Sequence, residues 1–325
     1  MALESGTYVK DLVSTNPPGT DAISQGDDHI RLIKSVLKNS FPSNSNAPIV
    51  PDISGNGDKY LQVNSGASAT QWVTLDVDAL TRRKGEVNRS IFEYVSGTSI
   101  KVYPGIYDMA NKGKNVSWDS ALTVTGLSGT DQWVYIYLDD DAISGTTVTA
   151  SDIIGSTTVP TWSDSKHGWY NGDDRCIFAV YFSGSAINKF YHDGSEHVSF
   201  DESSWIVDHN PPSRNVWVSV TVPTVPVFSM EADITFTMES DAGSTLGTSW
   251  RWRTTGSSSS TGHYMGKTEV DGSAYIEDDV TVEIRAYVAT SISDTTKSID
   301  YYASCADANQ RIQVANYGFY LPVGI

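Results

Sequence analysis

Short alternating segments separated by turns dominate the chain from about residue 90 onward, and they limit the fold more than any other feature. In "QWVYIYL" (132–138) the aliphatic residues share one strand face and the aromatic residues share the other. "RCIFAVYF" (175–182) is apolar on both faces, as a central strand is. "VWVSVTV" (216–222) alternates, and turn signals such as "YNGDD" and "HDGSE" fall between such segments. This spacing predicts a mainly β fold with two antiparallel β-sandwich or jelly-roll-like domains.

One amphipathic helix is predicted in front of the β-region, from Thr20 or Asp21 to about Asn39. Its apolar stripe follows helical spacing and consists of Ile23, Ile30, Ile33 and Leu37, widened by Leu32 and Val36. A helix of about 19 residues is marginal alone in water, so the stripe must be buried against another protein, sibling chains or the chain's own β-domains.

Composition shifts divide the chain into four parts. Residues 1–42 form an extended lead and the helix, and residues 43–89 form a linker, a hairpin in "KYLQVNSGASATQWVTL" and a neck. The first β-domain is expected at 90–210 and the C-terminal one at 211–325, with a Pro-Pro pair at their boundary.

The charge balance excludes several classes of partner. The 325 residues carry a formal net charge of −17, which gives no electrostatic footprint for nucleic acid and opposes binding to an anionic membrane. No apolar run approaches 18 residues, and the start has no signal-peptide pattern, so synthesis and folding in a cytosol are expected.

Of the two cysteines, Cys176 is predicted to be a buried free thiol and Cys305 belongs to no CxxC pair.

Acidic clusters are the only candidates for catalysis, at 139–141, 173–174 and 277–279. Neighbouring strand residues point to opposite faces, so exposed turn carboxylates are the favoured interpretation, although distant acids that converge in the fold remain an alternative. "YHDGSEH" (191–197) and 139–141 fit no known metal loop. We therefore predict no enzyme activity, no metal and no cofactor.

Aromatic side chains suit carbohydrate binding, because sugar rings lie against Trp or Tyr while polar neighbours bond the hydroxyls. The candidates are Trp162, Trp169 and Tyr170 in "TWSDSKHGWYNGDD", Trp205, and Trp250 and Trp252 in "TSWRWR". The alternative is that these rings fill cores or interfaces between chains. The C-terminal pair, beside the polar loop "TTGSSSSTG", is the preferred location.

The N-terminal string "YVKDLVSTNPPGTDAISQGDDHIRLIKSVLKNSFP" (8–42) resembles the first segment of many bacteriophage tail-fibre and tail-appendage proteins. "GNGDKYLQVNSGASATQW" (55–72) looks like the short segment that often follows it, and residues 94–200 are similar in rhythm to a β-domain of phage tail proteins. Residues 213–325 carry no specific resemblance.

The resemblance implies a virion protein of the tail, made in the host cytoplasm, that docks on other tail or portal-proximal proteins through its N-terminus. It implies attachment by Leu12, Val13, Ile23, Ile30, Arg31, Ile33 and Leu37. It also implies a homotrimer, in which Tyr60, Leu61, Val63 and Trp72 would be buried between chains, and binding to host surface glycan by the distal β-domain. Alternatives are a purely structural collar, adaptor or head fibre, and a glycan depolymerase.

Overall fold

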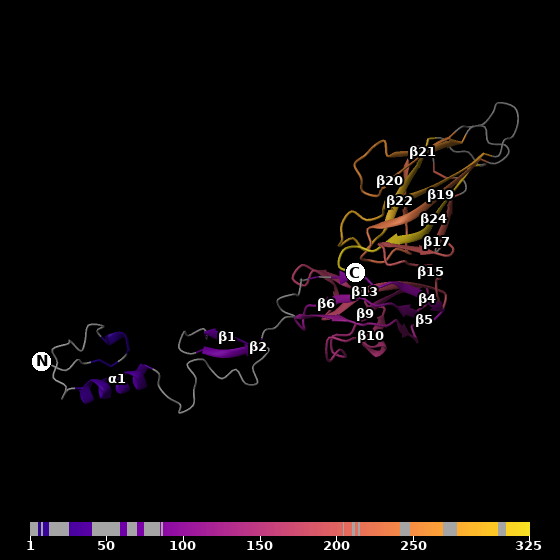
Figure 1. Ribbon diagram of the computed structural model, residues 1–325. Helices are drawn as coiled ribbons and strands as arrows, with labels where there is room; N and C mark the ends of the chain where they lie inside the picture. The colour runs from indigo at the N-terminus through magenta and orange to yellow at the C-terminus, as the bar shows by residue number, and fades with distance from the viewer. Residues whose placement is uncertain are drawn as a thin grey trace, which may run out of the picture. The chain divides into compact units, whose positions relative to one another are not determined.

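The computed structural model describes residues 6–7, 9–12, 26–40, 59–63, 70–74, 85, 87–203, 205–209, 212–213, 215–240, 248–268, 278–304 and 310–325 (Figure 1). The chain divides into two compact units, residues 1–77 and residues 78–325. Antiparallel strands prevail, and one α-helix is present in the N-terminal part. The predicted mainly β class with an N-terminal helix is therefore confirmed.

The first unit contains the 3-10 turn η1 (Val9–Asp11), the helix α1 (Gly26–Ser40) and a hairpin of β1 (Lys59–Val63) and β2 (Thr70–Thr74). Helix α1 lies against η1. The expected helix cap at Thr20 or Asp21 lies outside the described residues, whereas the hairpin predicted from "KYLQV" and "TQWVT" is confirmed. In the described part of the chain, no helix combines the length and apolar character needed to cross a membrane.

The second unit is built, over its described residues, from five antiparallel sheets. Two small sheets come first: β3 (Val87–Asn88), β6 (Ile106–Met109) and β7 (Lys114–Ser117), then β4 (Phe92–Ser96), β5 (Ser99–Val102) and β8 (Leu122–Val124). The sheet that we call the middle sheet has the order β10 (Ile153–Ser156), β9 (Gln132–Leu138), β13 (Asp174–Ser183), β12 (Gly168–Asn171) and β11 (Thr161–Ser163), with β14 (Ala186–Ile187) on β13. The 3-10 turn η3 (Ala150–Asp152) precedes β10.

The other two sheets contain the C-terminal strands. The β24 sheet has the order β15 (Phe190–Tyr191), β16 (His197–Phe200), β24 (Gln310–Tyr320), β19 (Glu231–Ser240) and β22 (Asp278–Tyr287), with β17 (Trp205–His209) also on β24. The last sheet has the order β18 (Trp217–Thr221), β23 (Ser298–Ala303), β20 (Thr248–Thr254) and β21 (His263–Thr268). The β24 sheet therefore draws strands from both sides of the boundary predicted at residues 210–211.

The middle sheet is covered on both faces, which explains the two-sided apolar pattern of its strands. On one face Phe178 of β13 stacks on Phe92 of β4, with ring centroids 4.0 Å apart. On the other face Trp133 of β9 packs edge-on against Phe319, at 5.3 Å, and Tyr135 packs against Phe228, at 6.0 Å. One apolar core thus runs through both β-regions. Cys176 lies in this core as a buried free thiol, as predicted.

The segment after β24 folds back beside β13 (Figure 1). The buried guanidinium of Arg175 donates to the backbone oxygens of Gly324 and Asp108. Arg89 donates to the backbone oxygens of Ile325 and Pro322, both at 3.0 Å. Two arginines that are distant in sequence, Arg89 and Arg175, therefore hold the last residues of the chain.

Candidate functional site

A groove of about 670 Å³ opens on the second unit between β4, β15 and the residue that follows β5. We call it the tyrosine groove. Its lining includes Glu93, Tyr94, Tyr103, Lys189, Tyr191 and His192. Strand β15 lies against β4, so residues about 100 positions apart in the sequence form its two sides.

Tyr191 presents an exposed but fixed aromatic ring at one side of the groove. Its side chain is 53% exposed, and its hydroxyl donates to Asp201. The ammonium of Lys189 lies 3.0 Å from the other Asp201 oxygen and 5.2 Å from the Tyr191 ring centroid. Hydrogen bonds from Tyr191 and Lys189 lower the pKa of the Asp201 carboxyl, while bonds to Tyr191 and Asp201 raise the pKa of Lys189. The ion pair therefore persists at neutral pH and orients the ring.

Tyr103 is fixed in the same way at the other side. Its hydroxyl donates to Glu93 Oε2 at 2.6 Å, and Lys101 Nζ lies 3.3 Å from the same oxygen. The bond from Tyr103, followed by that from Lys101, lowers the pKa of the Glu93 carboxyl. Both tyrosine rings are thus held before any ligand arrives, which reduces the entropy lost on binding.

The floor of the groove contains a neutral imidazole. The backbone N–H of Phe92 donates to His192 Nδ1 at 3.1 Å, so the ring proton must be on Nε2, which faces the Ser195 carbonyl oxygen at 2.9 Å. Burial lowers the pKa of His192. The imidazole is therefore uncharged at neutral pH and joins β4 to the 192–195 turn.

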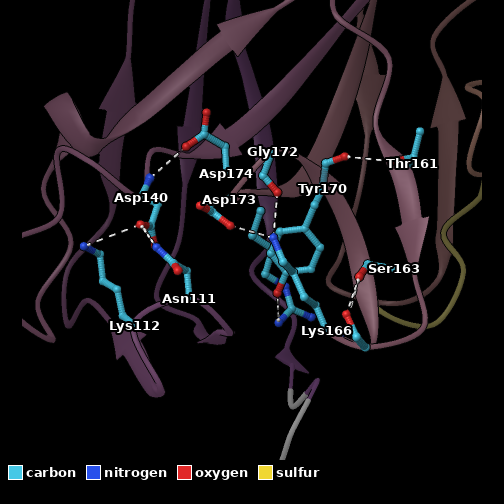
Figure 2. A network of polar contacts seen from close by, with 12 residues as sticks. Asn111, Lys112, Asp140, Thr161, Ser163, Lys166, Tyr170, Gly172, Asp173 and Asp174 are labelled. Atoms are coloured by element: carbon cyan, nitrogen blue, oxygen red, sulfur yellow. Dashed lines mark hydrogen bonds and ion pairs between the residues drawn. The ribbon is translucent and has the colours of Figure 1, made fainter.

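The middle-sheet aromatics predicted to bind glycan lie elsewhere and are largely buried. Trp169 is 2% exposed and packs against Phe228, and Tyr170 is 3% exposed. Figure 2 shows Lys166 beside Tyr170; the ammonium lies 4.7 Å from the ring centroid and is held by Asp173. Neither ring offers a face to a sugar, because the middle sheet is covered on both sides.

Trp162 differs from its two neighbours, because it is only half-buried. Its indole N–H donates to Asp164 at 2.7 Å, and its ring meets Trp169 edge-on.

The predicted aromatics of the C-terminal region also pack inward. Trp250 is fully buried, and the half-buried Trp252 stacks on His263 at 4.6 Å between ring centroids. The alternating Arg251 and Arg253 instead donate to carbonyl oxygens of the polar loop that follows β20. Trp205 is half-buried on β17. The structure thus brings none of the six predicted aromatics into the tyrosine groove.

Helix α1 presents three residues of its predicted apolar stripe to solvent. Ile30, Ile33 and Leu37 are 52%, 45% and 45% exposed, whereas Val36 is fully buried. Intrachain packing therefore covers Val36 but not the other three, so the alternative of burial on the chain's own β-domains does not account for these three residues. Arg31 is exposed and Leu12 is half-buried. Val13 and Ile23 lie outside the described residues.

The acidic clusters at 139–141 and 173–174 serve local structure (Figure 2), whereas the side chains of 277–279 lie outside the described residues. Asp140 is 4% exposed, unlike the exposed turn carboxylate expected there, and it accepts a hydrogen bond from Asn111 at 2.8 Å with Lys112 at 3.8 Å. The Asp140 N–H donates to Asp174 at 2.9 Å. Burial and the neighbouring acidic charges raise the pKa of Asp174. Across the described ranges, no three His, Cys, Asp or Glu side chains are placed to hold a metal ion.

The sequence analysis weighed "YHDGSEH" only as a metal loop and missed its place in the groove, because the signals of the groove residues are weak. Lys189 and Tyr191 alternate around the buried Phe190, which places both on one strand face. That two-residue strand is too short to stand out as a pattern, and its pairing with β4 is a tertiary event.

Comparisons with known proteins do not assign this chain to a family. No protein-family model and no curated protein matches the sequence. Among solved structures, a glycoside hydrolase family 43 arabinoxylan arabinofuranohydrolase from Bacillus subtilis is 10% identical with a TM-score of 0.19, over 86% of this chain and 71% of that chain. An insecticidal delta-endotoxin from Bacillus thuringiensis is 6% identical with a TM-score of 0.17, over 79% and 45% of the two chains. Likenesses this low carry no argument about function.

Proposed function

We propose that this chain is a structural component of a bacteriophage tail, held to the virion by its N-terminal segment, and that its β unit binds carbohydrate on the host surface through the tyrosine groove. The observation that carries the first part is the exposed stripe of α1. Burying an Ile or Leu side chain contributes about 1.5–3 kcal/mol, so three exposed ones on a single helix favour a docking face. The resemblance of residues 8–42 to tail-appendage proteins supplies the partner.

The groove supports the second part. Two tyrosine rings with fixed hydroxyls stand beside charged groups that can bond sugar hydroxyls. The lining carboxyls Glu93 and Asp193 both have lowered pKa values, caused by hydrogen bonds from Tyr103 and Ser195 respectively. Glycoside hydrolysis needs a carboxyl with a raised pKa as the general acid, so the groove favours binding over cleavage. This moves the proposed glycan site from the C-terminal tryptophans to the tyrosine groove.

Attachment is tested by particle assembly without the wild-type copy. Ile30→Asp with Ile33→Asp should abolish incorporation, because two charges would have to be buried on docking. Ser35→Asp with Asn39→Asp adds the same charge at exposed polar positions of α1 and should incorporate normally. Normal incorporation of the isoleucine variant would overturn the proposed anchor.

The glycan part is tested by adsorption and array binding of the purified chain. It should block phage adsorption and bind host polysaccharide, and Tyr191→Ala should weaken both effects without unfolding the β unit. A folded chain that blocks no adsorption would instead favour a structural collar or adaptor.

The chain is further proposed to act as a homotrimer, which light scattering measures directly. A monomer mass at micromolar concentration would count against it. Three copies of a shallow groove would raise avidity without new contacts.

A further inference from the structure

The register of the β24 sheet aligns five residues in one row across its outer face. Tyr191 is opposite Ser199, Ser199 is opposite Gly318, Gly318 is opposite Asp233, and Asp233 is opposite Arg285. Strands lie about 4.8 Å apart, so the four steps from β15 to β22 span roughly 19 Å. This row begins in the tyrosine groove, at Tyr191 and Ser199, and continues beyond the groove to Arg285.

A second depression lies along the same row. Its volume is about 370 Å³, and its lining includes Asp233, Glu283, Arg285 and Tyr320. Ser199 lines both this depression and the tyrosine groove. Gly318 carries no side chain at the centre of the row, and the hydrogen-bonded side chains of His197 and Asp233 lie across that position, so a polar pair lines the row between the two hollows.

The groups of the second depression are held in place like those of the groove. Tyr320 stacks on the His197 imidazole at 4.8 Å and donates to Asp233 at 2.9 Å. The guanidinium of Arg285 lies 3.8 Å from the Tyr320 ring centroid and pairs with Glu196 at 2.7 Å. The Arg285 side chain is still 46% exposed, so it can contact a ligand while keeping its partners.

We infer that the row is an extended track for a linear, uncharged oligosaccharide, with the tyrosine groove as its first subsite and the Asp233–Arg285 depression as its second. This inference rests on the proposed glycan-binding function. We infer an oligosaccharide rather than a monosaccharide because the row crosses five strands and is longer than a single sugar ring. The second subsite has no net positive charge, because the carboxylates of Asp233 and Glu283 outnumber the single guanidinium of Arg285. This charge balance disfavours an anionic sugar.

A peptide fits this row less well than a sugar chain. Extended peptides gain affinity by adding a strand to an open sheet edge, where backbone groups are free. The row instead crosses the face, and the backbones of β24 and β19 are paired on both sides. Only side chains face the ligand, and side-chain donors and acceptors suit hydroxyl groups.

The test measures how affinity depends on ligand length. The full chain is first screened on arrayed bacterial surface polysaccharides, and one that binds is cut by mild acid into size fractions for calorimetry. Fractions of several repeating units should bind about tenfold more tightly than a single unit. Arg285→Gln should remove that gain and leave short-fragment binding unchanged, whereas Tyr191→Ala should weaken both.

Arg311→Gln is the matched control. Arg311 also pairs with two carboxylates on this sheet, those of Asp208 and Glu239, but it lines neither hollow. It should bind all fractions like the wild type. Unfolding curves check each variant, and Arg285→Lys replaces any Arg285→Gln protein that does not fold.

The outcomes separate the two proposals. If all fractions bind with equal affinity, Arg285→Gln binds like the wild type and Tyr191→Ala binds more weakly, the extended track is overturned. The tyrosine groove then remains as the glycan-binding site. Binding only to acidic polysaccharides would overturn the inference that the ligand is uncharged. Failure to bind any polysaccharide overturns both proposals, as does adsorption that survives periodate oxidation of host glycans and is lost after protease treatment.

Discussion

His197 and Asp233 are hydrogen-bonded to each other although β24 runs between their strands, β16 and β19. The residue of β24 that lies between them is Gly318, which is opposite Ser199 on one side and Asp233 on the other. A Cβ at position 318 would lie 3.2 Å from His197 Nε2 and 3.3 Å from an Asp233 oxygen. The missing side chain therefore lets side chains from two non-adjacent strands meet.

The His197–Asp233 contact should stabilise the fold at acidic rather than basic pH. The hydrogen bond to Asp233 raises the pKa of His197, so the contribution is complete below about 6.5 and is lost as pH rises through the folded-state pKa. Both side chains are partly exposed, which limits the effect to less than about 1 kcal/mol. His197→Gln should lower the free energy of unfolding in urea at pH 6 and change it little at pH 9. An equal loss at both pH values would contradict this assignment.

Gly318→Ala should destabilise the β unit more than an exposed glycine substitution does. Its Cβ would lie 2.5 Å from the Val198 carbonyl oxygen, a backbone atom that cannot rotate away, and overpacking of this kind costs about 1–3 kcal/mol. Gly145→Ala is the control, because the nearest atom to its Cβ is 3.9 Å away. Denaturant unfolding of the two variants measures the difference, and equal midpoints would show that the sheet relaxes around the new methyl group.

Local patterns were enough to predict strands β9 and β13 of the middle sheet and the β1–β2 hairpin. "RCIFAVYF" is apolar on both faces because β13 lies between two layers, and this pattern is visible in eight consecutive residues. The hairpin follows from two short apolar runs around a polar turn. Such features depend on near neighbours in sequence, which a single sequence reveals.

The site depends on contacts that the sequence does not encode locally. Trp169 stands in a polar stretch that suggests an exposed loop, yet it is buried and packs against Phe228, which is distant in sequence. Trp250 lies beside a polar loop, yet it is fully buried. The tyrosine groove joins β4 with β15, about 100 residues later, and no periodicity links them. Exposure of an aromatic ring is set by tertiary packing, so polar neighbours in the sequence were not enough to predict which rings are exposed.

His192 and His197 should titrate on opposite sides of the ordinary histidine pKa, although five residues separate them. Burial lowers the pKa of His192, whose Nδ1 accepts the Phe92 N–H, whereas Asp233 raises the pKa of His197. His192 therefore contributes stability above about 6.5 that is lost as pH falls through its folded-state pKa. NMR titration of the imidazole protons, assigned with His192→Gln and His197→Gln, should give values below and above 6.5. Two coincident titrations would refute the opposite pKa shifts of the two imidazoles.

Arg175→Met should cause the largest loss of stability among these variants. The guanidinium is fully buried and donates to the backbone oxygens of Asp108, Gly85 and Gly324, so it joins β6, the start of the unit and the chain's last residues. Methionine fills much of the volume but leaves these carbonyl oxygens without a donor, and lysine lacks the planar fork that reaches several acceptors at once.

We expect Arg175→Met to lower the free energy of unfolding by about 1–3 kcal/mol for each carbonyl oxygen that stays buried without a donor. Arg175→Lys should lose less, because it keeps a charged donor. Arg311→Met provides the more accessible counterpart and should change the free energy of unfolding much less, since solvent screens its pairs with Asp208 and Glu239. If Arg175→Met and Arg311→Met unfold at the same denaturant concentration, the contact with the last residues contributes nothing to stability, and the groove strands must be held by the apolar core alone.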